Sequence, residues 1–318
     1  MAATRRGSGA SHESARRWSP VALERFRELE GATWSTRERR PGGLTLPLSS
    51  LRDVFAHREV LALLVRRDLK ARYKDSVLGM FWVLAKPLVQ LALYFVAIGL
   101  FLGASRGIPN FAIYIFTGLT IYGLFSEIVS GATQSVVSNG GLIKKVYIPR
   151  EIFPIASTGS ALINSGIQFG LLIVASLLSG AFNFAPQALY IIPSIMLILV
   201  YAVALGILLS AVNVYLRDMQ YLIEVFLMIF MWASPIIYSW GMVAKILGPG
   251  ILLEIYTDNP LTLAVLGMQQ GFWHGDAPTD YPDLLWMRMG IAFIVGIVLL
   301  VVCQRTFSRL EGDFAQSL

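Results

Sequence analysis

The chain has 318 residues, of which 55% are hydrophobic and only 14% are charged. Soluble domains carry about 25% charged residues, so this composition and a mean hydropathy of +0.63 exclude an ordinary water-soluble enzyme. The single cysteine, Cys303, excludes a disulfide framework and a cysteine-based zinc site, and the three histidines lie far apart in the sequence. We therefore expect no metal site, and the class that fits is a polytopic, all-α membrane protein.

Residues 1–50 are rich in Arg, Ser, Gly and Glu, and no apolar run follows the first arginines. This composition predicts a disordered, basic cytosolic tail and not a cleaved signal peptide. The rest of the chain, residues 51–318, is predicted to form one transmembrane domain.

Residues 61–75 (LALLVRRDLKARYKD) predict an amphipathic helix along the inner leaflet, with its basic side toward lipid headgroups or a partner. Asp68, Arg72 and Asp75 interrupt the pattern, because their spacing places them in one line inside the apolar arc. They predict either a self-neutralising surface salt bridge or a fixed polar contact where this helix docks on another part of the assembly.

Six hydrophobic runs are long enough to cross a membrane as helices, at about 20 residues per span. They cover residues 77–102, 111–129, 154–178, 188–214, 221–238 and 284–303. With the N-terminus inside, 22 Lys and Arg residues lie on the cytosolic side and three on the outer side. The count predicts cytosolic N- and C-termini. It also explains the basic excess as a topology signal, so we expect no nucleic-acid partner.

The connection between the second and third spans is apolar and basic. We expect residues 139–141 (NGG) to break the chain, and residues 142–147 to form one or two amphipathic turns before Pro149 stops them. Such a short helix could dock into a groove on a cytosolic partner. The alternative is an ordinary loop of the positive-inside type.

The connection between the fifth and sixth spans, residues 239–283, is too long for a hairpin and too apolar for a solvated loop. Its two hydrophobic stretches, residues 242–255 and 261–269, are each too short to cross a bilayer. Stretches of this length predict re-entrant or interfacial helices.

The sequence has no phosphate-binding loop of the form G-x-x-x-x-G-K-[ST], so this chain is not expected to bind ATP in that manner. Glu127 and Glu224 lie near the predicted cytosolic ends of their spans. We interpret them as interfacial carboxylates in water or in salt bridges, which leaves little support for proton-coupled transport.

An ordered set of landmarks over about residues 50–318 resembles the ABC-2 type permeases that export polysaccharides, including the O-antigen and teichoic acid exporters. The landmarks are residues 67–79 (RDLKARYKDSVLG), Trp82, Pro87, residues 139–150, Pro154, Asn213 with Arg217 and Asp218, residues 234–238 (SPIIY), and Asn259 with Pro260. Lys86 stands where the family is expected to have an uncharged polar residue.

The resemblance implies a transport subunit of the cytoplasmic membrane that is not itself an enzyme. It would homodimerise into twelve spans and pair with two cytosolic ABC ATPase subunits, which bind the ATP and Mg. Its substrate would be a lipid-linked cell-surface polysaccharide. The implied coupling helix comprises Asn139, Leu142, Ile143, Lys144, Lys145, Val146, Tyr147, Pro149 and Arg150, and the implied interface helix includes Arg67, Asp68, Lys70, Arg72, Tyr73 and Asp75.

A sugar polymer needs a wide path with many weak sites, and aromatic faces suit it because sugar C–H groups stack on them. The candidates for such a path are Trp82, Lys86, Tyr94, Phe95, Tyr114, Tyr122, Phe125, Phe226, Phe230 and Trp232. Aromatic residues in spans also form interfacial belts or pack against lipid. Lys86 either extends to the inner headgroups or contacts the phosphate or pyrophosphate of a lipid carrier.

Two other functions remain open from the sequence. One is an ABC-2 exporter of a small hydrophobic compound or drug. The other is a polytopic membrane glycosyl- or acyltransferase, which would need a cluster of acidic and basic residues at the membrane surface. The acids within residues 276–283 form such a cluster but have no partner base beside them.

Overall fold

A computed structural model describes residues 57–73, 81–103, 108–145, 148–182, 186–273 and 281–314, all of them within one compact unit. The predicted tail of residues 1–50 lies outside the described residues, as do Asp75, Val146 and Tyr147. For Tyr73 only the backbone is described.

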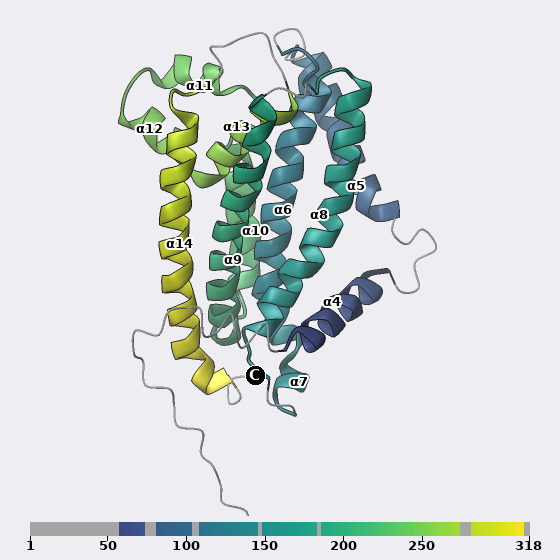
Figure 1. Cartoon of the computed structure of the whole chain (residues 1–318), viewed down its shortest axis with the longest axis vertical. Helices are drawn as coiled ribbons and strands as arrows, with labels where there is room; N and C mark the ends of the chain where they lie inside the picture. The colour runs from purple at the N-terminus through teal and green to yellow at the C-terminus, as the bar shows by residue number, and fades with distance from the viewer. Residues whose placement is uncertain are drawn as a thin grey trace, which may run out of the picture. The chain divides into compact units, whose positions relative to one another are not determined.

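Five of the described helical segments are long and apolar enough to cross a membrane, which confirms an all-α, multi-pass architecture (Figure 1). At about 1.5 Å per residue, each exceeds the ~30 Å of a hydrocarbon core. They are α5 (Phe81–Tyr94) with the π-helix Phe95–Phe101, α6 (Phe111–Ser138), α8 (Ile152–Leu178), the 3₁₀ helix Pro186–Tyr190 with α9 (Ile191–Tyr215), and α14 (Leu285–Leu310).

The sixth apolar helix, α10 (Met219–Trp232), has 14 residues and is shorter than the predicted span of residues 221–238. The prediction of its end was wrong because the helix ends at Trp232, and the buried residues after it, up to Ile237, form a turn that packs against α6. There the Tyr114 hydroxyl donates to the carbonyl oxygens of Pro235 and Tyr238 at 3.2 and 2.9 Å. Gln269 Nε2 also donates to the Pro235 oxygen, at 2.8 Å.

The connection that follows α10 contains three short helices where two were expected. They are α11 (Trp240–Leu247), α12 (Ile251–Thr257) and α13 (Pro260–Phe272). Gly248, at φ 66°, divides the first apolar stretch because its left-handed backbone ends α11. Asn259 caps α13 by accepting the Leu261 N–H at 3.1 Å, and nearly all of α13 is buried. None of the three is long enough to span a membrane, as predicted.

α6 is the central helix of the main core, and it packs against α8, α9, α10 and α13. Its contact with α9 is close because both helices carry small residues. A Cβ atom added to Gly206 would lie 2.7 Å from Ala132 Cβ. Beside this contact, Asn213 Nδ2 donates to the Thr133 carbonyl oxygen at 3.1 Å, so one of the sequence landmarks joins α9 to α6.

A second, smaller core, here called the basal cluster, lies at the end of the helices where α4 (Arg58–Tyr73) and α7 (Gly140–Ile143) are found (Figure 1). It joins α4, α6, α8, α9 and the end of α14. Its buried members are Leu64, Val136, Ile152, Phe153, Ala156, Ile207, Ala211, Val214, Phe307 and Phe314. The predicted amphipathic helix is therefore present, and its apolar face is the one that packs on the bundle.

Candidate functional site

Arg72 joins α4 to the long helices. Its guanidinium forms an ion pair with the carboxylate of Glu127 on α6, and Asn164 Nδ2 on α8 donates to the same carboxylate oxygen at 2.7 Å. Of the two interpretations of the charged line on this helix, the structure supports a fixed polar contact in the case of Arg72. Glu127, expected as an interfacial carboxylate in water or in a salt bridge, forms a salt bridge.

The ion pair that Asp68 forms, in contrast, lies within α4 itself. Asp68 is paired with its neighbour Arg67, whose Nη2 atom lies 2.8 Å from Asp68 Oδ1. Exposed ion pairs of this kind contribute about 0–1 kcal/mol. Arg66, Arg67 and Lys70 thus present a basic surface on the side away from the basal cluster.

The segment between α6 and α8 begins with Asn139, directly after the last residue of α6. Asn139 closes α6, and its Nδ2 atom donates to the Ser135 carbonyl oxygen at 2.7 Å. The expected helix over residues 142–147 was misplaced, because α7 already begins at Gly140 and ends at Ile143. The side chains of the segment divide as predicted: Leu142 and Ile143 pack on the basal cluster, whereas Lys144 and Lys145, directly after α7, are exposed.

The exit of this segment contacts the end of the last helix. Pro149 is half-buried, and the Arg150 guanidinium lies over the Phe314 ring, 5.5 Å from its centroid. Glu151 Oε1 accepts the Ser308 hydroxyl at 3.1 Å. Sequence reasoning missed Glu151, Ser308 and Phe314, because no local periodicity connects residues more than 150 positions apart.

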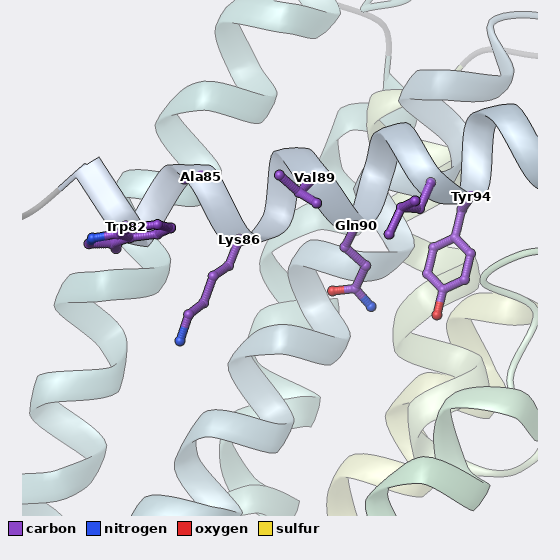
Figure 2. Close-up of a pocket in the computed structure, with 7 residues that line it drawn as sticks. Trp82, Ala85, Lys86, Val89, Gln90 and Tyr94 are labelled. Carbon is purple, nitrogen blue, oxygen red and sulfur yellow. The ribbon is translucent and has the colours of Figure 1, made fainter. Parts of the chain in front are cut away.

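One face of α5 forms a shallow groove of about 360 Å³. Figure 2 shows Trp82, Lys86, Gln90 and Tyr94 extending from the same side of the helix, as their four-residue spacing requires. Ala85, Val89 and Leu93 complete the lining. The groove brings together three of the predicted path residues, Trp82, Lys86 and Tyr94, and adds Gln90.

The other predicted path residues divide into exposed and buried sets. Phe226 and Trp232 on α10 are exposed, and the Phe230 ring lies against the Phe226 ring in a tilted arrangement, with 4.2 Å between ring centroids. Tyr114 and Phe125, in contrast, are each only 3% exposed and offer no free ring face. The two remaining candidates are half-buried: Tyr122 donates to the Leu227 oxygen at 3.0 Å, and Phe95 lies against Phe111.

At the opposite end of the bundle, Arg288 near the start of α14 forms a double ion pair. Its Nη1 atom lies 2.6 Å from Glu254 Oε2 and 2.7 Å from Asp258 Oδ1. The pair ties α12 and the residue after it to α14. No local sequence pattern predicted this contact, because the three residues belong to two segments that are 30 or more positions apart.

Comparisons with known proteins place these features in a family. The chain is 27% identical to the O-antigen export system permease protein RfbA of Myxococcus xanthus over 269 residues, which cover 84% of this chain and 98% of that protein. It is 26% identical to the protein of the same name from Klebsiella pneumoniae, over 82% of this chain and 95% of that one. The description of the ABC-2 type transporter family matches residues 59–273. The chain therefore belongs to the ABC-2 type transporter family.

Proposed function

We propose that this chain is the permease subunit of an ABC exporter that moves a lipid-linked cell-surface polysaccharide across the cytoplasmic membrane. The observation that carries the proposal is its similarity, over nearly the full length of each relative, to proteins named as O-antigen export permeases. The sequence has no phosphate-binding loop, so the energy would come from ATP and Mg bound by a separate ABC ATPase.

In the proposed topology, α10 is the sixth membrane-crossing element and both termini are cytosolic. The Lys and Arg distribution of 22 to three supports this orientation. It places α4, α7 and the basal cluster at the cytosolic surface. It places α11, α12 and α13 near the outer surface as re-entrant or interfacial helices.

The ATPase would dock on residues 139–150, here called the coupling segment. This segment leaves α6 and enters α8, so a force applied to it acts directly on two of the long helices. Leu142 and Ile143 seat it on the basal cluster, while Lys144 and Lys145 remain exposed for a partner. Exposed lysines steer association with an acidic partner surface and make it sensitive to salt.

The substrate path would lie between two copies of the chain. α5 and α10 both flank α6, and Tyr94 on α5 donates a long hydrogen bond to Met231 Sδ on α10 at 3.9 Å. Their outer faces carry the exposed path candidates Trp82, Lys86, Phe226 and Trp232. In a homodimer, two such faces would line a single path with aromatic surfaces and one cation from each copy.

Lys86 would contact the phosphate or pyrophosphate of the lipid carrier. No described residue forms a hydrogen bond or ion pair with its ammonium group, although it lies five residues into an apolar helix. A cation inside a span costs about 2.5–3.5 kcal/mol at mid-bilayer unless it finds a partner or reaches the interface. Lys86→Gln should therefore lower export while ATPase coupling is preserved, and unchanged export would reject this role.

Deletion of the gene tests the function directly. Without the chain, the lipid-linked polysaccharide should accumulate on the inner leaflet and disappear from the cell surface, and the intact chain should restore it. Loss of resistance to hydrophobic compounds with normal surface polysaccharide would instead favour the drug-export function.

Co-purification with an ABC ATPase tests the docking site. The Lys144→Glu/Lys145→Glu variant should lose the ATPase, because both lysines are exposed on the coupling segment. Lys245→Glu is the matched control, since it reverses an equally exposed lysine on α11 at the other end of the bundle. Equal retention of the ATPase by both variants would reject the docking site.

A further inference from the structure

The last described residues fold back onto the bundle after α14. A 3₁₀ helix, Glu311–Asp313, follows Leu310, and the side chain of Phe314 is 0% exposed. Ends of chains usually fray unless specific contacts tie them down. Residues 311–314, here called the C-terminal hook, are held by contacts of that kind.

The ring of Phe314 is held on three sides. The Phe307 ring meets it edge to face at 5.6 Å and 89°, and the Tyr215 ring meets it at 6.0 Å and 64°. The third neighbour is the Arg150 guanidinium, 5.5 Å from the ring centroid. Edge-to-face pairs and cations above ring faces are both attractive arrangements. Phe314 therefore connects α9, α14 and the exit of the coupling segment.

Hydrogen bonds and charges beside the ring reinforce this connection. The Ser308 hydroxyl donates to Glu151 Oε1 at 3.1 Å, and the Tyr215 hydroxyl donates to the Leu310 carbonyl oxygen at 2.7 Å. Burial and the neighbouring Glu151 raise the pKa of Glu311 to about 7, while Arg150 opposes the increase. The hook and the residues just before α8 thus share one electrostatic environment.

The exit of the coupling segment also contacts the basal cluster. Arg150 and Glu151 stand immediately before α8, and Ile148 is half-buried against the basal cluster to which Phe314 belongs. An element that fixes Arg150 and Glu151 also fixes the direction in which the segment enters α8.

We propose that the C-terminal hook, through Phe314 as a positioning residue, holds the exit of the coupling segment in place. Movement of the part of the segment that carries Lys144 and Lys145 is then transmitted to α8 and α14. Without the hook, a change of conformation at residues 148–151 would take up this movement. The hook needs no contact with substrate or nucleotide. The part of this inference that concerns energy transfer rests on the proposed function; the part that concerns position does not.

Thiol labelling of the purified chain tests the position. A cysteine introduced by Ile148→Cys reports whether the exit opens, and the native Cys303, which is buried in α14, reports in the same molecule whether the bundle stays folded. Phe314→Ala should raise maleimide labelling at position 148 by about tenfold, since a local opening replaces a packed ring. Arg309→Ala, an exposed change in the last turn of α14, is the control and should leave labelling unchanged.

A second variant keeps the test informative if Phe314→Ala exposes Cys303 as well. Ser308→Ala removes only the hydrogen bond to Glu151, so the bundle should remain closed and labelling at position 148 should rise by about two- to threefold. Unchanged labelling at position 148 in both variants would overturn the proposal.

The assembled transporter tests the consequence. With the ATPase bound, Phe314→Ala should retain ATP hydrolysis while the polysaccharide exported per ATP falls several-fold, whereas Arg309→Ala should match the wild type. Normal export per ATP in a variant with raised labelling would overturn the coupling part. A wild-type chain that binds no ABC ATPase would reject the proposed function, and the labelling result would still decide whether the hook positions the segment.

Discussion

The close contact between α6 and α9 allows a quantitative test of the packing that supports the coupling segment. Gly206 faces Ala132, which is 1% exposed and lies six residues before the end of α6. A Cβ atom at position 206 would come within 2.7 Å of Ala132 Cβ, against about 3.5–4.0 Å for an ordinary carbon contact. Neither atom can rotate away, because both are attached directly to the backbone.

The expected energies follow from this geometry. Gly206→Ala should cost about 1–3 kcal/mol of overpacking, reduced by about 1 kcal/mol of helix propensity. Ala132→Gly should cost about 1 kcal/mol of propensity and about 1 kcal/mol for the small void. In the double variant the propensities cancel and the methyl group returns from the opposite side. The single variants together should lose about 2–4 kcal/mol, so a double variant whose stability is close to that of the wild type gives a coupling energy of about 2–4 kcal/mol.

SDS-induced unfolding in mixed micelles measures the four free energies of unfolding. Gly166→Ala on α8 is the matched control, because a Cβ atom there would have no neighbour within 4 Å and only the propensity should change. A double variant as unstable as the sum of the single variants, with coupling below about 0.5 kcal/mol, would refute the close-contact reasoning.

Three further predictions concern charged residues. Arg72→Ala should lower the free energy of unfolding by about 1–3 kcal/mol, because it leaves the partly buried Glu127 carboxylate without its cation. Arg66→Ala, an exposed change on the same helix, is the control and should alter the free energy of unfolding little. Equal effects of the two changes would contradict the docking contact. Arg288→Ala should increase protease cleavage of residues 248–258, and Lys245→Ala should not. The raised pKa of Glu311, about 7 against 4.5, means that its carboxyl stabilises the fold as the pH falls from about 7 toward 4.5. Melting temperatures at pH 8 and 6 should reveal this gain, and a gain of the same size in Glu311→Gln would contradict it.

Hydropathy predicted the long helices well, because the property that makes a segment cross a membrane as a helix belongs to that segment alone. A helix in lipid must satisfy its own backbone hydrogen bonds, so long apolar runs such as Pro186–Tyr215 can be recognised one at a time. The ends were less predictable. α6 continues to Ser138 and α14 to Leu310, because a helix can extend beyond the hydrocarbon on polar residues that a hydropathy count rejects.

The sequence predicted which kinds of residue form the candidate site, but it did not predict which residues they contact. Periodicity indicated that Arg72 lies on the apolar side of its helix, yet only the fold brings Glu127 and Asn164 to it. The aromatic path candidates show the same limit, since burial separates Tyr114 from Trp82 and no local pattern distinguishes them. Which side chains meet depends on the packing of separate helices, and a single sequence does not contain that information in readable form.

The shortness of α10 has a consequence for the membrane itself. Its 14 residues extend about 21 Å, beside an α6 of 28 residues that extends about 42 Å. If α10 crosses the membrane as proposed, lipid tails that meet it would face a hydrophobic surface thinner than an undisturbed bilayer, and such mismatch is relieved by local thinning or tilting. A polar headgroup that passes along this face would have less hydrocarbon to cross. Depth-dependent quenching of a fluorophore attached through Ile229→Cys, on the exposed side of α10, would measure the local thickness and reject this consequence if it matched the bulk bilayer.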